Sequence, residues 1–323
     1  MNLLTALDGF LLSLRARGYA LATIELYRYV LDNLADFLDN PEVGRIKPAD
    51  LDRYFAYLRD GYHPNRKSGD ASPLAGSTLQ NHHKGVKAFF GWAADELRLK
   101  TRPDTRLKLP DNNPRLIKPL TQDEIKALMA VAERTKAAQT GTRKAFTMRR
   151  RTADRDAAIV LVLLDTGLRV GELARLTVKD VNITTGEIFI APFGESRRKT
   201  KSRAVFLGKV ALRALWRYLA ARPAHSPADP LFVSSRDGSP MNRNSIRLLL
   251  ADMGQRAGVE NVHPHRFRHT FAIEFLRNGG DVFSLQRLLG HADLETVKIY
   301  LELAQADTQN AHRRASPADR MKL

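Results

Sequence analysis

Residues 265–300 read HRFRHTFAIEFLRNGGDVFSLQRLLGHADLETVKIY, and this stretch decides how the chain is interpreted. His265 and Arg268 stand three residues apart at the expected start of a helix, so their side chains project to one side. His291 follows a Leu-Leu-Gly turn, and Tyr300 comes nine residues later. Helical apolar spacing predicts helices at about 266–278, 282–289 and 293–305. The stretch therefore combines imidazoles, a guanidinium and a phenol within three short helices and their turns.

A second short motif, TGLRVGEL at residues 166–173, lies earlier in the chain. Gly167 permits a tight turn that would present Arg169 at the start of a helix predicted over about 170–176. Taken separately, such residues are weak signals. An arginine in a helix is usually solvated, and a tyrosine in an apolar pattern is usually part of the core. Their joint presence in this order and spacing points to a chemical site.

The first hundred residues show helical apolar spacing and predict a four-helix domain. The expected helices are 2–17, 21–39, 48–59 and 77–97. On the fourth helix we expect a polar side that carries Asn81, His82, His83, Lys84 and Lys87. Residues 101–117 contain three prolines, many charges and no apolar period, which is typical of an extended interdomain linker.

The rest of the chain predicts a second, mostly helical domain over 118–323 with one small antiparallel sheet. Thr121 followed by Glu124 is a capping-box signature that opens its first helix. Further helices are expected at about 154–165, 208–221 and 243–257, and short runs rich in β-branched and aromatic residues predict strands at 187–191 and 203–207. Residues 135–155 form a basic insertion that either contacts DNA or is a mobile loop. The fold class is therefore mainly α.

Composition points to a nucleic acid as the partner. Lysine and arginine total 52 against 35 acidic residues, which gives a net charge of +17 and a pI near 10.3. The basic residues are spread along expected helices and loops, as on a folded nucleic-acid-binding surface. The absence of cysteine excludes disulfides and thiolate chemistry. No apolar run is long enough to span a membrane and no signal peptide is recognisable, so we expect a cytoplasmic, nucleoid-associated protein.

These motifs resemble those of the tyrosine recombinase (phage integrase) family, in particular its XerC- and XerD-like integrases. The shared pattern is T-G-L-R, a lysine in a β-hairpin, H-x-x-R, then L-G-H and a tyrosine nine residues beyond. The resemblance extends to the N-terminal helices, which are similar to the family's SAM-like core-binding domain, and so covers nearly the whole chain. It implies a DNA clamp at 1–100, a linker at 101–117 and a catalytic domain with a C-terminal tail at 118–323.

Carried over position by position, the resemblance implies a catalytic role for each matching residue. Arg169 and Arg268 would bind the scissile phosphate, and His265 and His291 would donate hydrogen bonds to it or assist proton transfer. Tyr300 would attack phosphorus and leave a 3′-phosphotyrosyl bond and a free 5′-hydroxyl. Reversal of that step on another strand would exchange strands through a Holliday junction, which defines a site-specific recombinase.

An acidic residue and a hairpin lysine complete the implied site. Glu172 matches a family acidic position that supports the active site. Lys199 is our assignment for the hairpin lysine, because its Lys-Thr pair matches the family pattern best, and Lys201 is the alternative. This lysine would protonate the leaving 5′-oxygen as a general acid.

The chemistry agrees with these residue types. Two guanidiniums offer forked donors to a phosphate and remain charged at any working pH. A tyrosine hydroxyl has an ordinary pKa of about 10, so at neutral pH it needs a proton acceptor or a positive field, and His265 is a candidate acceptor. The chain has neither a carboxylate cluster of the kind that holds Mg²⁺ nor a P-loop, so we expect no metal and no nucleotide cofactor.

We expect a double-stranded DNA with a specific recombination site as the partner, bound chiefly through its phosphates. The candidate DNA-binding residues are His83, Lys84 and Lys87 on the fourth helix and Arg243, Asn244 and Arg247 on the helix over 243–257. In the family such a C-terminal tail commonly packs into a neighbouring protomer, which implies a homotetramer on DNA. The need for an accessory DNA-bending protein stays open.

Two other functions are weighed against recombination. A protein of the same fold that binds DNA without cleaving it is disfavoured, because every catalytic position holds the expected residue type. A related type IB topoisomerase would use the same tyrosine chemistry as a monomer, but the tail and the paired H-x-x-R and L-G-H motifs favour the recombinase. The sequence leaves open the target site and whether the role is integration, chromosome dimer resolution or inversion.

Overall fold

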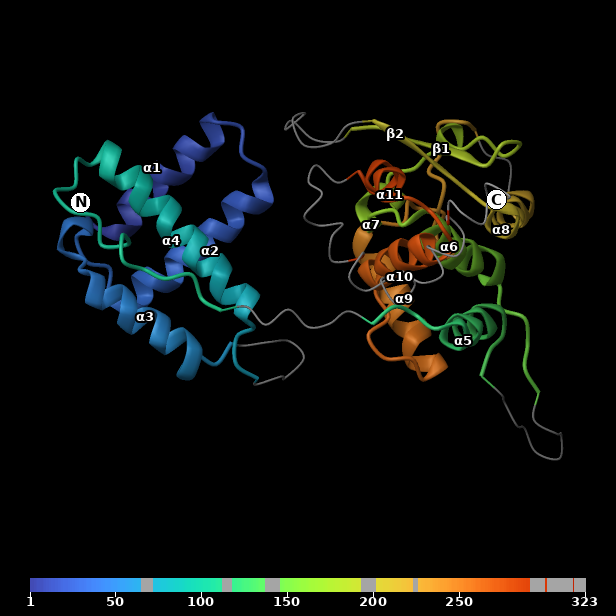
Figure 1. Ribbon diagram of the computed structural model, residues 1–323, viewed down its shortest axis with the longest axis horizontal. Helices are drawn as coiled ribbons and strands as arrows, with labels where there is room; N and C mark the ends of the chain where they lie inside the picture. Colours follow the sequence, from blue (N-terminus) through green and yellow to red (C-terminus); the bar gives the residue numbers. More distant parts are fainter. Residues whose placement is uncertain are drawn as a thin grey trace. The chain divides into compact units, whose positions relative to one another are not determined.

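The fold is described from a computed structural model of the full chain. The described residues are 1–64, 72–111, 118–136, 146–192, 202–222, 226–290, 300 and 316. Those up to 111 form one compact unit, and those from 118 onward form a second one (Figure 1).

The first unit is the four-helix assembly that the apolar spacing predicts. Its helices are α1 (Leu3–Ala16), α2 (Leu21–Leu38), α3 (Pro48–Asp60) and α4 (Gly76–Glu96), with a 3-10 turn, η1 (Val43–Arg45), before α3. Pro48 stands in the first turn of α3, where its missing N–H costs nothing. Phe10 of α1 and Phe89 of α4 meet edge to face in the core, with ring centroids 5.7 Å apart. The predicted helices are thus confirmed.

Two histidines of α4 lie inside this unit, which corrects the polar side expected for that helix. His82 is 1% exposed, and its Nδ1 lies 2.9 Å from the hydroxyl of Tyr54. His83 is buried too, and its Nε2 lies 3.2 Å from the carbonyl oxygen of Leu107. The expectation was wrong because α4 packs against α1, α2 and α3, so more than one of its faces is covered. Lys84 is exposed as expected.

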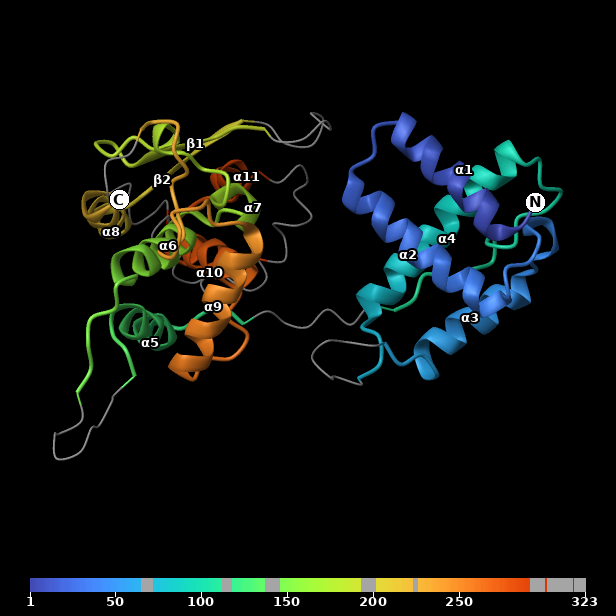
Figure 2. The same ribbon diagram turned by 180° about the vertical axis from the view of Figure 1, so that it is seen from behind.

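The second unit is built around α6. Its helices are α5 (Gln122–Glu133), α6 (Ala153–Thr166), α7 (Val170–Leu173), α8 (Lys209–Ala221), α9 (Arg243–Ala257), α10 (Pro264–Arg277) and α11 (Val282–Leu289), with the 3-10 turn η2 (Val178–Asp180). α6 packs against α5, α8 and α10, and its aliphatic residues supply much of the core (Figure 2). The capping box between Thr121 and Glu124 is present at the start of α5, as predicted.

One small antiparallel sheet completes the second unit, also as predicted. It pairs β1 (Glu187–Ile190) with β2 (Arg203–Phe206), and Ile188 lies opposite Val205. Both of these side chains are buried, so one face of the hairpin joins the core. Residues 193–201 of the basic stretch between the strands, with Lys199 and Lys201 among them, lie outside the described residues.

The ends of the basic insertion pair with each other. The backbone N–H of Thr135 donates to the carbonyl of Met148, and the backbone N–H of Arg150 donates to the carbonyl of Glu133. The middle of the insertion, 137–145, and most of the C-terminal segment expected to be helical at 293–305 lie outside the described residues. Within the described part of the chain, no helix is both long and apolar enough to cross a membrane.

Candidate active site

A glycine turn after α6 positions the first arginine. Gly167 ends α6 with a φ of +60°, a left-handed conformation that favours glycine. A Cβ there would collide with the ring of Phe271 and would lie 3.0 Å from Leu289. The turn can therefore press closely against α10 and the end of α11. Two residues later, Arg169 forms the N-terminal boundary of α7.

The two candidate arginines converge on one backbone carbonyl. Arg268 donates Nη1 to the carbonyl of Gly167 and Nη2 to the carbonyl of Leu289, both at 2.7 Å. Arg169 directs its Nη1 at the same Leu289 oxygen, at 3.5 Å. Arg268 is 4% exposed, whereas the side chain of Arg169 is 38% exposed. One guanidinium is thus fixed inside the protein, and the other faces solvent beside it.

Glu172 links Arg169 to a third arginine, Arg203 at the start of β2. The Glu172 carboxylate accepts the backbone N–H of Arg169 at 2.9 Å and its Nη1 at 3.3 Å. It also accepts both terminal nitrogens of Arg203, at 3.0 and 2.8 Å. Burial raises the pKa of Glu172, but the bonds and charge of Arg203, with those of Arg169, outweigh it and hold the pKa below its ordinary value.

Tyr300 and His265 lie in the electrostatic field of the same arginines. Tyr300 is 3% exposed and belongs to a small core cluster with residues of α10 and α11. Burial raises the pKa of its phenol, and the charges of Arg268 and Arg169 partly counteract this. Burial lowers the pKa of His265, and Arg268 and Arg169 lower it further. At neutral pH the phenol is therefore protonated and the imidazole is neutral.

Burial also acts on two further groups of the site. It lowers the pKa of Arg268 to about 10, with a contribution from Arg169, so the guanidinium stays charged at neutral pH. His269 lies against Tyr300, with ring centroids 5.3 Å apart, and burial followed by the charge of His265 lowers its pKa to about 4. His291 lies outside the described residues.

The structure therefore brings together Arg169, Glu172, His265, Arg268 and Tyr300. Sequence reasoning did not single out Arg203 or His269. Arg203 had no signal beyond being a charged residue at the start of a strand. His269 stands next to Arg268 in the quoted stretch, and that adjacency was its only clue.

A pocket beside His265 collects the candidate DNA-binding residues of α9. Its volume is about 790 Å³, and it is lined by Val170, Asn242, Arg243, Asn244, Arg247, His263, Pro264 and His265. Arg243, Asn244 and Arg247 are all exposed. Because they share a pocket with His265, a ligand held by α9 would reach the first turn of α10.

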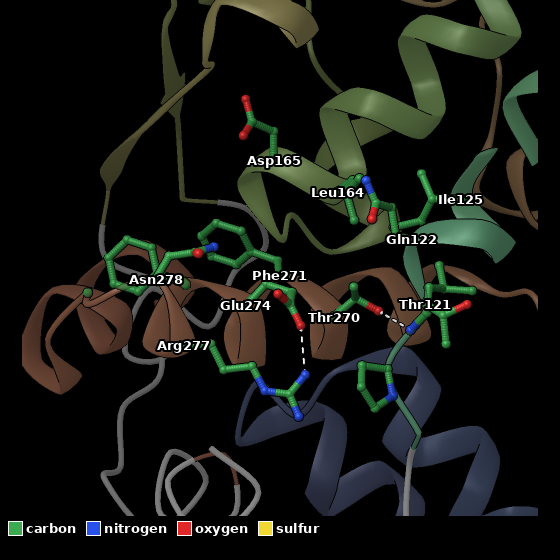
Figure 3. A pocket seen from close by; sticks show the side chains of 14 residues that line it. Thr121, Gln122, Ile125, Leu164, Asp165, Thr270, Phe271, Glu274, Arg277 and Asn278 are labelled. Carbon is green, nitrogen blue, oxygen red and sulfur yellow. Dashed lines mark hydrogen bonds and ion pairs between the residues drawn. The ribbon is translucent and has the colours of Figure 1, made fainter. Parts of the chain in front are cut away.

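A second pocket lies between α5, α6 and α10 (Figure 3). Its volume is about 820 Å³. Its lining is largely apolar, with Leu164 and Phe271 among the walls. Thr270 accepts the backbone N–H of Leu120 at its edge, at 2.8 Å. None of the candidate catalytic residues lines this pocket, so it is separate from the site described above.

Comparison with known proteins identifies the class. Residues 118–307 match the phage integrase family, and residues 7–98 match the phage integrase N-terminal SAM-like domain. A tyrosine recombinase XerC of Shewanella amazonensis is 31% identical, over 93% of this chain and 91% of its own. A tyrosine recombinase XerC of Leptospira interrogans is 28% identical, over 93% and 89%. A structure of the Tn1549 transposon integrase in complex with a circular intermediate DNA has a TM-score of 0.72 at 18% identity, and covers 94% of this chain and 99% of that one.

The chain belongs to the phage integrase family. It is a site-specific DNA recombinase of the tyrosine type, similar to XerC proteins over most of its length. The Tn1549 integrase shares its fold, including the SAM-like N-terminal helices. The resemblance stated from the sequence motifs is thus confirmed.

Proposed function

We propose that this recombinase cleaves and rejoins DNA through a covalent bond between Tyr300 and a 3′-phosphate, without metal or nucleotide. The observation that carries the proposal is the convergence of Arg169 and Arg268 on the carbonyl of Leu289. The same two charges act on His265 and Tyr300. A phosphodiester under attack gains negative charge on its non-bridging oxygens, and cations already fixed in place stabilise that charge.

In the proposed first step, the phenolic oxygen of Tyr300 attacks phosphorus, and the bond from phosphorus to the 5′-oxygen breaks. The phenolic proton passes to His265, whose lowered pKa keeps it neutral and able to accept. The leaving 5′-oxygen takes a proton from Lys199, with Lys201 as the alternative. A 5′-hydroxyl from another strand then attacks the phosphotyrosine, restores the phenol and completes exchange through a Holliday junction. His291 would assist at the phosphate.

We assign duplex DNA as the partner, held by both units. Residues 1–100 would act as a clamp, 101–117 as a linker and 118–323 as the catalytic domain. Exposed Lys84 and half-buried Lys87 of α4 would bind phosphates, as would the exposed α9 residues beside His265: Arg243, Asn244 and Arg247. His83 is removed from this set, because its ring is buried against the carbonyl of Leu107.

We further propose that four protomers assemble on two DNA sites, as strand exchange between two duplexes requires four cleavages. Sedimentation of the protein on duplexes that carry its site tests this. A complex of four chains and two duplexes supports recombination. A single chain on each duplex, together with relaxation of supercoiled DNA, would favour a topoisomerase. Sedimentation with and without an added DNA-bending protein shows whether assembly needs one.

Covalent trapping tests the proposed chemistry. The protein is incubated with nicked duplexes drawn from its own genomic surroundings, quenched with detergent and resolved on a denaturing gel. We expect a protease-sensitive DNA adduct that Tyr300→Phe abolishes. The matched control is Tyr218→Phe, since Tyr218 is the other tyrosine described in the catalytic unit and is also buried. Tight duplex binding without any adduct would contradict the proposal, as would an adduct that survives Tyr300→Phe.

A further inference from the structure

Arg203, the first residue of β2, directs its whole guanidinium into the protein. Its Nη1 and Nη2 donate to the two carboxylate oxygens of Glu172, at 3.0 and 2.8 Å, and its Nε donates to the carbonyl of Leu288 at 2.7 Å. Its side chain is 8% exposed. All three nitrogens of Arg203 therefore bind protein oxygens, and the largely buried side chain acts chiefly on groups of the protein itself.

One acceptor of Arg203 binds an arginine of the proposed phosphate site, and the other adjoins the residue that binds the second arginine. Glu172 accepts the backbone N–H and the Nη1 of Arg169. Leu288 precedes Leu289, whose carbonyl accepts Nη2 of Arg268. A single side chain therefore fixes the carboxylate that orients one guanidinium and the backbone segment that orients the other.

Gly290 leaves room for this contact. It ends α11 with a φ of +63°, and a Cβ there would lie 3.0 Å from Nη1 of Arg203. The guanidinium thus passes directly over the glycine to reach Glu172. The same glycine precedes His291 in the chain. The contact therefore lies among the residues assigned to phosphate binding, and not at a remote point of the core.

We propose that Arg203 is a positioning residue, which ties strand β2 to Glu172 and to the end of α11 and so sets the geometry of Arg169 and Arg268. The inference rests on the proposed function, because it assigns these two arginines to the phosphate. In the sequence, Lys199 and Lys201 stand four and two residues before Arg203.

A single-turnover measurement of adduct formation tests the role of Arg203. At saturating protein on a nicked duplex, we expect Arg203→Gln to lower the rate constant by about 10- to 100-fold, because a small misplacement of catalytic groups has a cost of that size. Its affinity for the duplex should stay within about threefold of wild type, since the largely buried guanidinium of Arg203 is bound to protein oxygens. Arg203→Lys should recover part of the rate, because an ammonium reaches Glu172 but lacks the planar fork.

Arg155→Gln is the matched control. Arg155 on α6 donates Nε and Nη2 to the carboxylate of Asp156 and Nη1 to the carbonyl of Val233, so it forms the same kind of buried pair away from the site. We expect it to lower the melting temperature as Arg203→Gln does, while its adduct rate stays within about twofold of wild type. Equal rate losses in the two variants would reduce Arg203 to a structural role and overturn the inference.

The pH profile supplies a readout that a general loss of stability would not move. Without Arg203, burial raises the pKa of Glu172 with less opposition. The loss of adduct rate in Arg203→Gln should therefore grow as the pH falls from 8 to 5.5. The double variant Glu172→Gln, Arg203→Gln should form the adduct no more slowly than the slower of the two single variants. A wild-type adduct with an unchanged Arg203→Gln rate would refute this inference alone. A wild-type protein that forms no adduct would refute the proposed function itself.

Discussion

Arg268 shows how a cation is kept charged inside this protein. Burial lowers its pKa to about 10, which is still well above neutral pH. Its two terminal nitrogens meet the carbonyls of Gly167 and Leu289, so the planar fork is oriented before any DNA binds. Donors that need no reorganisation at the moment of reaction are the most effective ones for stabilising a transition state. The backbone around Arg268 is therefore part of the proposed catalytic apparatus.

Replacement of Arg268 by lysine keeps the charge and removes the fork. An ammonium cannot bridge the carbonyls of Gly167 and Leu289 in one plane while also facing a phosphate. We expect Arg268→Lys to slow adduct formation by about 100-fold or more, while duplex affinity changes little. Single-turnover rates and fluorescence anisotropy on the same nicked duplex measure the two effects. A variant within about threefold of the wild-type rate would show that charge alone is sufficient.

Among the elements, the turn from α6 into α7 combines a left-handed backbone with close packing against α10. Gly167 needs a positive φ and also lies against Phe271. We expect Gly167→Ala to cost about 2–5 kcal/mol of stability, because the left-handed backbone and the collision both contribute. Gly238→Ala is the control, since Gly238 has a φ of +69° with nothing within 4 Å of a Cβ. It should cost only about 1 kcal/mol.

Denaturant titration of both glycine variants measures this difference, and the adduct assay follows its consequence. Gly167→Ala should also lose cleavage activity, because its carbonyl orients Arg268. Equal stabilities for the two variants would mean that the packing of the turn against α10 does not matter.

Helix α4 makes the first unit sensitive to acid through His82. Burial lowers the pKa of His82 to about 4, against an ordinary value of 6.5. Between these values the unfolded chain takes up a proton that the folded one does not, so stability falls as the pH falls from 6.5 to 4, by up to about 3 kcal/mol. His82→Phe removes the titrating group and should flatten this dependence, and Tyr54 keeps its hydrogen bond to the carbonyl of Val30, at 3.3 Å.

Tryptophan fluorescence isolates the first unit in that experiment. The chain has two tryptophans, Trp92 on α4 and Trp216 on α8. Trp216 is more than half exposed, so Trp216→Phe leaves Trp92 as the single reporter at little cost. Parallel pH dependences for His82→Phe and its parent would show that another group causes the acid sensitivity.

The elements were largely predictable from sequence, whereas the partners of their side chains were not. The helical spacing of apolar residues predicted the described helices, and runs of β-branched and aromatic residues predicted both strands. Both patterns arise because one face of each element is buried. The pairing of Arg203 with Glu172 joins residues 31 positions apart, and no local pattern encodes it. The prediction that His82 lies on a polar side was wrong for a related reason. An amphipathic pattern is interpreted as a helix with one buried face, whereas α4 packs against three other helices.

At the scale of the whole molecule, the net charge of +17 is the dominant feature. Each cation that neutralises a DNA phosphate releases a counterion, so affinity falls steeply with salt. We expect Arg247→Gln to reduce the slope of log affinity against log salt by about one. Arg236→Gln, an exposed arginine outside the candidate set, should leave the slope unchanged. Anisotropy titrations between low and physiological salt measure both slopes, and identical changes would remove α9 from the proposed interface.

The most direct test of the central assignment is the chemical identity of the residue joined to DNA. The trapped adduct is digested with nuclease and trypsin and examined by mass spectrometry. Cleavage after Lys298 and Arg313 releases residues 299–313, in which Tyr300 is the single tyrosine. We expect this peptide to carry the nucleotide through a phosphate on Tyr300, as the proposed mechanism requires. A nucleotide found on any other peptide of the chain would contradict it.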